Sequence, residues 1–501
     1  MLISKSMQTI KILSPYFVLL ALVFAVVSCD LEVQPNELST IDNLLSEEGG
    51  LETATNGTYA LFKDVLPFGG QLFGNSNNDY TRHLYQMSEF AADNVMYTQF
   101  SSDPLYLIFT REHFSGQQNS SYFWFIAYRM MLGTNLVISS ATEGADVITD
   151  QIIGENYFLR ALTTFDLLRF FAKPYSHGTE NPGVILRRSL DEPAIKSRST
   201  VGECYQKVVE DLLKAEELMA DDESRGVEFG SKLAAQALLS RVYLYMEQND
   251  KAIEYANKVI DNTVGVTLAS NGVYMDNFAN TPTSSESIFV IKFTQQDGRG
   301  KNGSIGSMYY DDGNNNGWGE VFASETFRNL VRSNADDIRN DLLISTGGTK
   351  SGYPIHYITK FSGQEGIPNL ASPQYLRLSE IYLNRAEAYA KTGGMDQDAL
   401  DDVNMIRERA GLSGADLYTI GNLGGKSVLD IVLEERRLEL AYEGHRGFDL
   451  IRNKRDLVRD YEGIHLENGD TRVTIPWNDD RWVFYIPQIE LDTNPSCEQN
   501  D

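Results

Sequence analysis

One tryptophan of the chain stands in a loop that offers it little apolar surface to pack against. Trp318 lies in the segment DDGNNNGWG (311–319), where glycines flank it and three asparagines precede it. Sugar rings have apolar CH faces that stack on flat aromatic rings, and their hydroxyl groups need polar partners to replace lost water. Trp318 and Asn316, with the nearby Tyr309 and Tyr310, provide both kinds of group. The segment therefore predicts a sugar-binding surface, with loop packing or contact with a partner protein as the alternatives.

The densest charge pattern in the chain spans residues 434–452. Paired carboxylates could act there as general acid and base in glycoside hydrolysis. However, Glu435 and Glu439 lie one helical turn apart, and Arg436 and Arg437 are spaced to pair with neighbouring helices. On a helix such residues more often form ion pairs that fix packing, so we expect a structural role.

Motifs for other chemistry are missing from the sequence. It contains no GxSxG, no HExxH and no CxxC, and it has only six histidines. Neither a nucleophilic hydrolase nor a zinc site is indicated. We therefore expect no enzymatic activity, no cofactor and no metal, with a glycoside hydrolase as the least favoured alternative.

The composition is that of an acidic globular protein, 42% hydrophobic and 23% charged, with a formal net charge of −27. Such a chain, without a basic stripe, repels phosphate backbones, so nucleic acid is a poor partner. The charge also disfavours strongly anionic polymers as ligands. Neutral ligands fit best.

The first thirty residues differ from the rest. Lys5 and Lys11 precede an uncharged apolar run at 16–27, a pattern typical of a secretory signal peptide over residues 1–28. The run is shorter than the roughly 20 residues needed to span a bilayer. Cys29 follows AVVS as in a lipobox, so we expect it to be acylated and to anchor the mature protein to a membrane. An ordinary secreted protein is the alternative.

The other cysteines, Cys204 and Cys497, lie far apart in the sequence. An oxidising envelope would permit a disulfide between them, but two cysteines do not define a disulfide framework. We expect both to be unpaired.

The elements that position these residues are mostly amphipathic helices. Apolar residues at three- and four-residue spacing predict helices at 122–140, 154–173, 200–219, 231–248, 251–261, 374–391, 398–410 and 428–446. Thr200 and Glu203 are spaced as a capping box at the start of the third helix.

Two helix pairs, at 237–253 and 386–400, resemble tetratricopeptide units, with small residues that permit close packing. Long irregular stretches at 69–113, 175–198 and 272–375 separate the helices, with one strand expected at 287–293. The expected fold class is mainly α, a tetratricopeptide-like helical scaffold that carries long irregular loops with minor β structure.

Several blocks of sequence together resemble a known family. The most characteristic are LRLSEIYLNRAEAY at 376–389 and EERRLELAYEGHRGFDL at 434–450. Others lie at 29–35, 155–175 and 486–495. In this order, behind a lipobox, they are similar to the SusD/RagB-like nutrient-binding outer-membrane lipoproteins of the Bacteroidota.

The resemblance implies a single SusD-like domain over 29–501, with an N-terminal part (29–225), a helical-repeat pair (226–270) and a C-terminal part (271–501). It also implies an oligosaccharide-binding lipoprotein that is anchored in the outer membrane, faces the cell exterior and delivers its ligand to a SusC-like TonB-dependent transporter. Some relatives bind peptides, so a peptide-binding protein of the same fold is the main alternative.

The resemblance also suggests site residues. It places Trp318 near the ligand face, and it implies an arginine, an asparagine and an aromatic residue from the N-terminal region. The nearest matches are Arg82, Asn94 and Tyr97. The tryptophan expected in that region is absent, and Tyr97 or Phe100 stands in its place, which puts the identity of the ligand in doubt.

Overall fold

The computed structural model describes residues 41–67, 78–221, 224–262, 264–466 and 472–500. The predicted signal peptide and Cys29 lie outside this range. Residues up to Glu48 belong to one unit, which contributes the short helix α2 (Ile41–Ser46), and residues 49–501 form a second, much larger unit. Among the described residues, no helix combines the length and the apolar character needed to cross a membrane.

Helices dominate the larger unit. They are α3 (Gly50–Ala60), α4 (Tyr80–Phe90), α5 (Leu105–Thr110), α6 (Gln118–Ser140), α7 (Val147–Phe171), α8 (Val201–Leu218), α9 (Lys232–Tyr245), α10 (Asn249–Ile260), α11 (Asp276–Ala279), α12 (Glu325–Val331), α13 (Leu378–Lys391), α14 (Asp396–Arg409), α15 (Val428–Glu439), α16 (Arg446–Arg452) and α17 (Gln488–Thr493). The capping box predicted at Thr200 and Glu203 is present at the start of α8.

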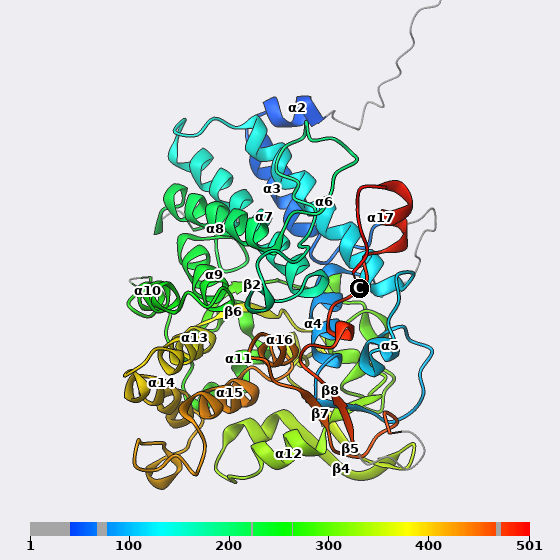
Figure 1. Ribbon diagram of the computed structural model, residues 1–501, viewed down its shortest axis with the longest axis vertical. Helices are drawn as coiled ribbons and strands as arrows, with labels where there is room; N and C mark the ends of the chain where they lie inside the picture. The colour runs from blue at the N-terminus through cyan, green and yellow to red at the C-terminus, as the bar shows by residue number, and fades with distance from the viewer. Residues whose placement is uncertain (1–40, 68–77, 222–223, 263, 467–471, 501) are drawn as a thin grey trace, which may run out of the picture. The chain divides into compact units, whose positions relative to one another are not determined.

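Helices from α7 to α10 and from α13 to α15 follow one another along one side of this unit (Figure 1). Each packs against its neighbour, and α10 also packs against α13, which joins the two parts of the series. The predicted tetratricopeptide-like pairs are α9 with α10 and α13 with α14. Alanines are buried on all four of these helices, so their backbones can approach closely.

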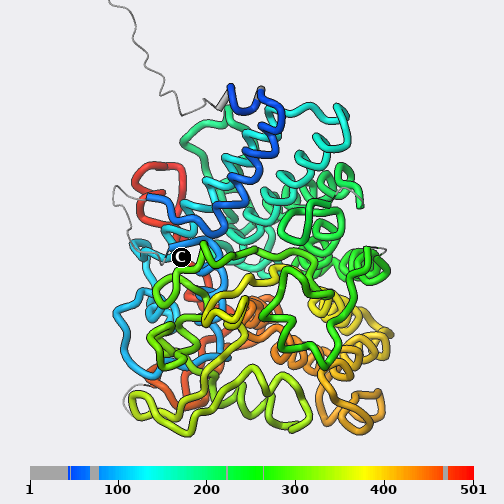
Figure 2. Tube along the Cα trace, turned by 180° about the vertical axis from the view of Figure 1, so that it is seen from behind, coloured from blue at the N-terminus to red at the C-terminus, as the bar shows by residue number. Residues whose placement is uncertain are grey.

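The strands are short (Figure 1), and the loop-rich part of the chain that carries most of them lies beside the helical series (Figure 2). Within the described ranges they form four separate antiparallel pairs: β1 (Val95–Tyr97) with β3 (Val321–Ala323), β2 (Ser287–Val290) with β6 (Gln374–Arg377), β4 (Leu343–Lys350) with β5 (Tyr353–Ile358), and β7 (Leu457–Arg459) with β8 (Val473–Ile475). The predicted fold class, mainly helical with minor β structure, is confirmed.

Two stretches predicted to be irregular contain helices. In the first, α4 begins after Asp79, whose side chain accepts a hydrogen bond from the Arg82 backbone N–H. Every residue of α4 is buried, although the helix contains arginine, histidine, glutamine and glutamate, so its composition resembles that of an exposed segment. In the second, α12 is a short helix of seven residues. Local pattern predicted neither.

The charged segment at 434–452 is a buried ion-pair network, as predicted. Arg377 on β6 lies 2.7 Å from Glu286, 2.6 Å from Glu439 and 2.7 Å from Glu443. Arg339 pairs with Glu435 at 2.6 Å. Burial alone would raise the pKa of Glu439, but the surrounding arginines outweigh it and lower that pKa. The network therefore ties α15 to the loop-rich part of the protein and holds the Glu439 carboxylate ionised.

Candidate ligand-binding site

The loop that carries Trp318 is held at its base by backbone hydrogen bonds. The N–H groups of Trp318 and Gly319 both donate to the Ser307 carbonyl oxygen, at 2.6 and 3.1 Å. A Cβ atom at Gly317 would lie 1.8 Å from the Tyr310 carbonyl oxygen, so only glycine fits the close approach of the two ends of the loop. The loop thus has a fixed base although its sequence is rich in glycine and asparagine.

The ring of Trp318 projects from this base and is 41% exposed. The Lys301 ammonium lies 3.8 Å from the ring centroid, a cation–π contact, and donates to Asn315 Oδ1 at 2.6 Å. The Lys350 ammonium donates to the Trp318 carbonyl oxygen. The indole is therefore oriented by its neighbours and still open to solvent.

Polar groups of the same loop are ordered around Asp312. Its carboxylate accepts hydrogen bonds from the Asn314 backbone N–H at 2.9 Å and from the Asn316 amide at 2.7 Å. The Asn316 carbonyl oxygen in turn accepts from the Asn369 amide at 2.8 Å. These contacts fix the positions of amides and a carboxylate that could exchange hydrogen bonds with sugar hydroxyls.

A second segment lies beside the loop because β1 pairs with β3. The pairing continues past β1, where the Thr98 N–H donates to the Glu320 carbonyl oxygen at 3.2 Å. The Gln99 amide donates to the Glu320 carboxylate at 2.9 Å and accepts from the Ser351 hydroxyl at 3.1 Å. Phe100 follows directly and is 79% exposed. Its ring makes an edge-to-face contact with the Tyr106 ring, with the ring centroids 5.9 Å apart.

Glu320 is the half-buried carboxylate of this surface. Burial raises the pKa of its carboxyl group, and Lys350 and the Gln99 amide oppose that rise. We use the name Trp318 surface for Trp318, Phe100, Gln99, Asn316, Glu320, Lys301 and Lys350. It offers two exposed rings together with amide, carboxylate and ammonium groups, which suits a ligand with both apolar faces and hydroxyl groups.

The structure separates the predicted site residues into two sets. Trp318 is exposed, and Asn316 and Tyr310 are partly buried next to it along the loop. Tyr310 packs its ring against Tyr357, with centroids 5.6 Å apart. By contrast, Tyr309 is fully buried and stacks on Phe361.

The three residues suggested from the N-terminal region also lie inside the protein. Arg82 is 3% exposed and pairs with Asp103 at 3.6 Å. Asn94 is fully buried and accepts a hydrogen bond from Arg437 at 2.8 Å. Tyr97 is fully buried among aromatic rings. Together with Tyr309, these side chains are not available to a ligand on the surface, and the Trp318 surface is defined without them.

The sequence did not point to Gln99, Glu320, Lys301 or Lys350, and Phe100 was considered only as an alternative to Tyr97 in place of the expected tryptophan. Gln99 and Glu320 come together because the pairing of β1 with β3 continues to Thr98 and Glu320, 222 residues apart in sequence, whereas Lys301 and Lys350 come from other segments. No local pattern carries that information. The apolar ring of Phe100 beside the polar SSD segment at 101–103 was the one local signal.

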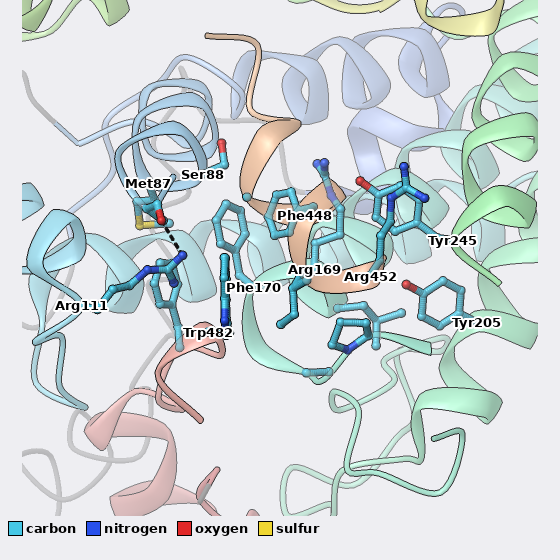
Figure 3. A pocket seen from close by; sticks show the side chains of 17 residues that line it. Met87, Ser88, Arg111, Arg169, Phe170, Tyr205, Tyr245, Phe448, Arg452 and Trp482 are labelled. Carbon is cyan, nitrogen blue, oxygen red and sulfur yellow. Dashed lines mark hydrogen bonds between the residues drawn. The ribbon is translucent and has the colours of Figure 1, made fainter. Parts of the chain in front are cut away.

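A different cavity, of about 40 Å³, lies between α4, α7 and α16 (Figure 3). Arg111 and Trp482 lie side by side in its wall (Figure 3). The Arg111 guanidinium donates to the Ala91 carbonyl oxygen at 2.5 Å and lies 4.4 Å from the Trp482 ring centroid. The other arginines in its wall, Arg169 and Arg452, are bound to carboxylates. Such a volume holds only a few water molecules. This cavity is part of the packed interior.

The fold and the Trp318 surface define a helical-repeat protein that presents aromatic rings on ordered loops. The sequence matches the SusD family over residues 232–501, more than half of the chain, and the chain belongs to that family. Residues 51–244 match a second description, "Starch-binding associating with outer membrane". The two matches meet within α9.

Individual relatives cover most of the chain. SusD-like protein P2 of Formosa agariphila is 25% identical in an alignment of 474 positions that covers 87% of this chain and 90% of that protein. The starch-binding protein SusD of Bacteroides thetaiotaomicron is 26% identical, over 72% of this chain and 74% of that protein. A crystal structure of a SusD superfamily protein from Bacteroides thetaiotaomicron superposes with a TM-score of 0.78 at 28% identity, over 92% of this chain and all of that one.

Proposed function

We propose that the protein binds a neutral oligosaccharide at the Trp318 surface and catalyses no reaction on it. The observation that carries this proposal is an indole, 41% exposed, on a loop whose base and polar side chains are fixed by hydrogen bonds. Membership of the SusD family supports the proposal, as does the similarity to a protein named for starch binding. The carboxylates at 434–452 are engaged by arginines, which argues against their use in acid–base chemistry.

Binding at such a surface is an equilibrium capture. Each ring that stacks on a sugar contributes about 1 kcal/mol, and ordering of the ligand opposes it. Two rings and several hydrogen bonds give dissociation constants on the order of micromolar to millimolar. Weak binding suits a protein that must release its ligand to another.

We further propose that the ligand passes to a SusC-like TonB-dependent transporter in the outer membrane. In this proposal, residues 1–28 direct export and acylated Cys29 anchors the protein on the cell exterior. The description of the N-terminal match, which mentions association with the outer membrane, supports this location. Mass spectrometry of the protein extracted from membranes tests the anchor. We expect the mature chain to begin at Cys29 and to carry an acyl group on that residue.

Isothermal titration calorimetry tests the binding proposal. The purified protein would be titrated with neutral oligosaccharides of different linkage and with peptides of matched length. We expect saturable heat with at least one oligosaccharide, and loss of most of that heat in Trp318→Ala. Heat with peptides alone would contradict the proposal and support the peptide-binding alternative.

A further inference from the structure

The chain has a second tryptophan that is partly exposed beside an open cavity. This cavity has a volume of about 270 Å³ and lies between the turn η1 (Tyr175–His177), the end of α16 and the segment that follows β8. Its wall includes Lys173, His177, Asn181, Lys454, Trp477 and Asn478. None of these residues belongs to the Trp318 surface. The volume is near the lower end of the roughly 300–1,000 Å³ found for small-molecule sites.

Trp477 differs from the two tryptophans of the protein interior. Trp124 and Trp482 are buried, and their indole N–H groups donate to Glu490 at 3.1 Å and to the Pro476 carbonyl oxygen at 2.8 Å. Within the described part of the chain, the indole N–H groups of Trp477 and Trp318 have no such partner. Trp477 thus keeps a hydrogen-bond donor for a ligand.

The ring of Trp477 is held in place at the edge of the cavity. Its backbone N–H donates to the Asp456 carboxylate at 2.9 Å. The His177 imidazole packs edge-on against the Trp477 ring, with the ring centroids 5.0 Å apart and an interplanar angle of 80°. His177 Nε2 lies 3.0 Å from the Ile451 carbonyl oxygen. The indole and imidazole therefore form an ordered aromatic corner.

Polar groups with unused capacity surround this corner. The ammonium of Lys454 lies 5.7 Å from the Trp477 ring centroid, and no carboxylate of the described residues lies within 4.0 Å of it. Lys301 and Lys350, beside Trp318, share that property, although most lysines are paired. The Asn181 amide donates to the His177 and Gly178 carbonyl oxygens at 3.2 and 3.0 Å, which fixes its position.

Carboxylates at the rim of the cavity are already neutralised. Asp479 pairs with Arg481 at 2.7 Å, and Asp480 pairs with Lys173 at 3.0 Å. Burial lowers the pKa of His177, so its imidazole is neutral at neutral pH and can exchange hydrogen bonds with hydroxyl groups. The cavity is therefore left with the Lys454 ammonium as its one unpaired charge among the described residues, next to neutral groups that exchange hydrogen bonds, which suits a ligand rich in hydroxyl groups.

We propose that this cavity is a second carbohydrate-binding site, which holds one sugar unit against Trp477. The sugar would present an apolar face to the indole and its hydroxyl groups to Lys454, Asn181 and Asn478. This site goes beyond the function proposed for the Trp318 surface and does not depend on it. A long glycan, or a second chain of the same glycan, could occupy both sites at once.

Fluorine NMR of the protein labelled with 5-fluorotryptophan tests this proposal directly, because the chain contains only four tryptophans. Trp477→Phe and Trp318→Phe assign the two relevant resonances. The probes are maltose, cellobiose, laminaribiose, mannobiose and xylobiose, each titrated into the wild type and into Trp318→Ala. We expect the Trp477 resonance to move in a saturable way with at least one disaccharide, in both proteins.

Two lysine variants provide the matched comparison. We expect Lys454→Ala to weaken the response of Trp477 about tenfold, the effect of losing a hydrogen bond from a charged donor. Lys232→Ala removes another lysine without a carboxylate partner among the described residues and leaves the response unchanged.

The possible outcomes separate the two sites. A Trp477 resonance that no disaccharide moves would overturn the second site. If the Trp318 resonance moved in that case, the function proposed for the Trp318 surface would stand. Movement of Trp477 alone would support the second site and contradict the first.

Discussion

Charged residues play opposite parts in the helical scaffold and at the Trp318 surface. Arg377 and Glu439 are almost completely buried and saturated by partners, and they join α15 to the loop-rich part of the chain. Lys301 contacts the exposed indole of Trp318, and Lys350 donates to the backbone carbonyl oxygen of the same residue. Neither ammonium has a carboxylate within 4.0 Å among the described residues. Burial with partners gives charged groups a structural role, whereas exposure without them leaves charged groups available for a ligand.

The largest expected effect is in the scaffold. Arg377→Ala would leave Glu286, Glu439 and Glu443 buried without their shared cation, so we expect the free energy of unfolding to fall by about 3–5 kcal/mol. Denaturant unfolding followed by circular dichroism measures it. Lys251→Ala breaks an exposed pair with Glu254 and should leave the transition unchanged. A midpoint for Arg377→Ala equal to that of Lys251→Ala would contradict the comparison.

A variant that fails to fold would leave no transition to measure. Arg407→Ala is the milder substitution, because Glu435 keeps its contact with Arg339 when Arg407 is removed. We expect a smaller loss of unfolding free energy than for Arg377→Ala and a larger one than for Lys251→Ala.

The next expected effect is on the pH dependence of stability, in which two buried carboxyl groups before β1, those of Glu89 and Asp93, act in opposite directions. Burial raises the pKa of Glu89 to about 7, above its ordinary value of 4.5. The protonated form is thus favoured in the folded protein, and its stabilisation is complete below pH 4.5 and lost as pH rises through 7. The loss is on the order of 3 kcal/mol. We expect Glu89→Gln to flatten the dependence of unfolding free energy on pH in this interval.

Asp93 provides the control of opposite sign. Burial alone would raise its pKa, but Arg437 and Arg446 outweigh that effect and lower it. Its stabilisation is therefore present above its ordinary pKa of 3.8 and is lost as pH falls below that value. Asp93→Asn should flatten the acid side of the same curve. Identical curves for the wild type and both variants would show that neither carboxyl group titrates as described.

At the Trp318 surface the expected effects are on affinity rather than stability. Trp318→Ala removes the stacking ring, so we expect the affinity for the bound oligosaccharide to fall by about 5–30-fold, equivalent to about 1–2 kcal/mol. The unfolding transition should not move, since the ring is 41% exposed. Phe114→Ala removes an exposed ring outside this surface and should leave the affinity unchanged. Equal losses in both variants would argue against a specific surface.

The smallest effect is expected at Phe100. Its ring is 79% exposed and smaller than an indole, so Phe100→Ala should weaken binding only about two- to fivefold. The same calorimetric titration measures it. A loss larger than that of Trp318→Ala would move the centre of the site from the loop to the segment that follows β1.

Local sequence predicted the scaffold better than it predicted the site. Helices such as α9 and α13 are 14 residues long and carry apolar and small residues on their buried faces, so they could be predicted. Helix α4 is shorter and is buried on every side in spite of its polar and charged residues, so its sequence did not indicate a core helix. Trp318 could be singled out because its own loop is polar. Gln99 and Glu320 meet through strand pairing across the chain, which no local pattern records.

A crystal structure with a bound neutral oligosaccharide tests the central claim most directly. We expect a sugar ring packed against the indole of Trp318 within about 4 Å, with its hydroxyl groups bonded to side chains of the Trp318 surface. An oligosaccharide bound only elsewhere, with the Trp318 ring still free in solvent, would contradict it.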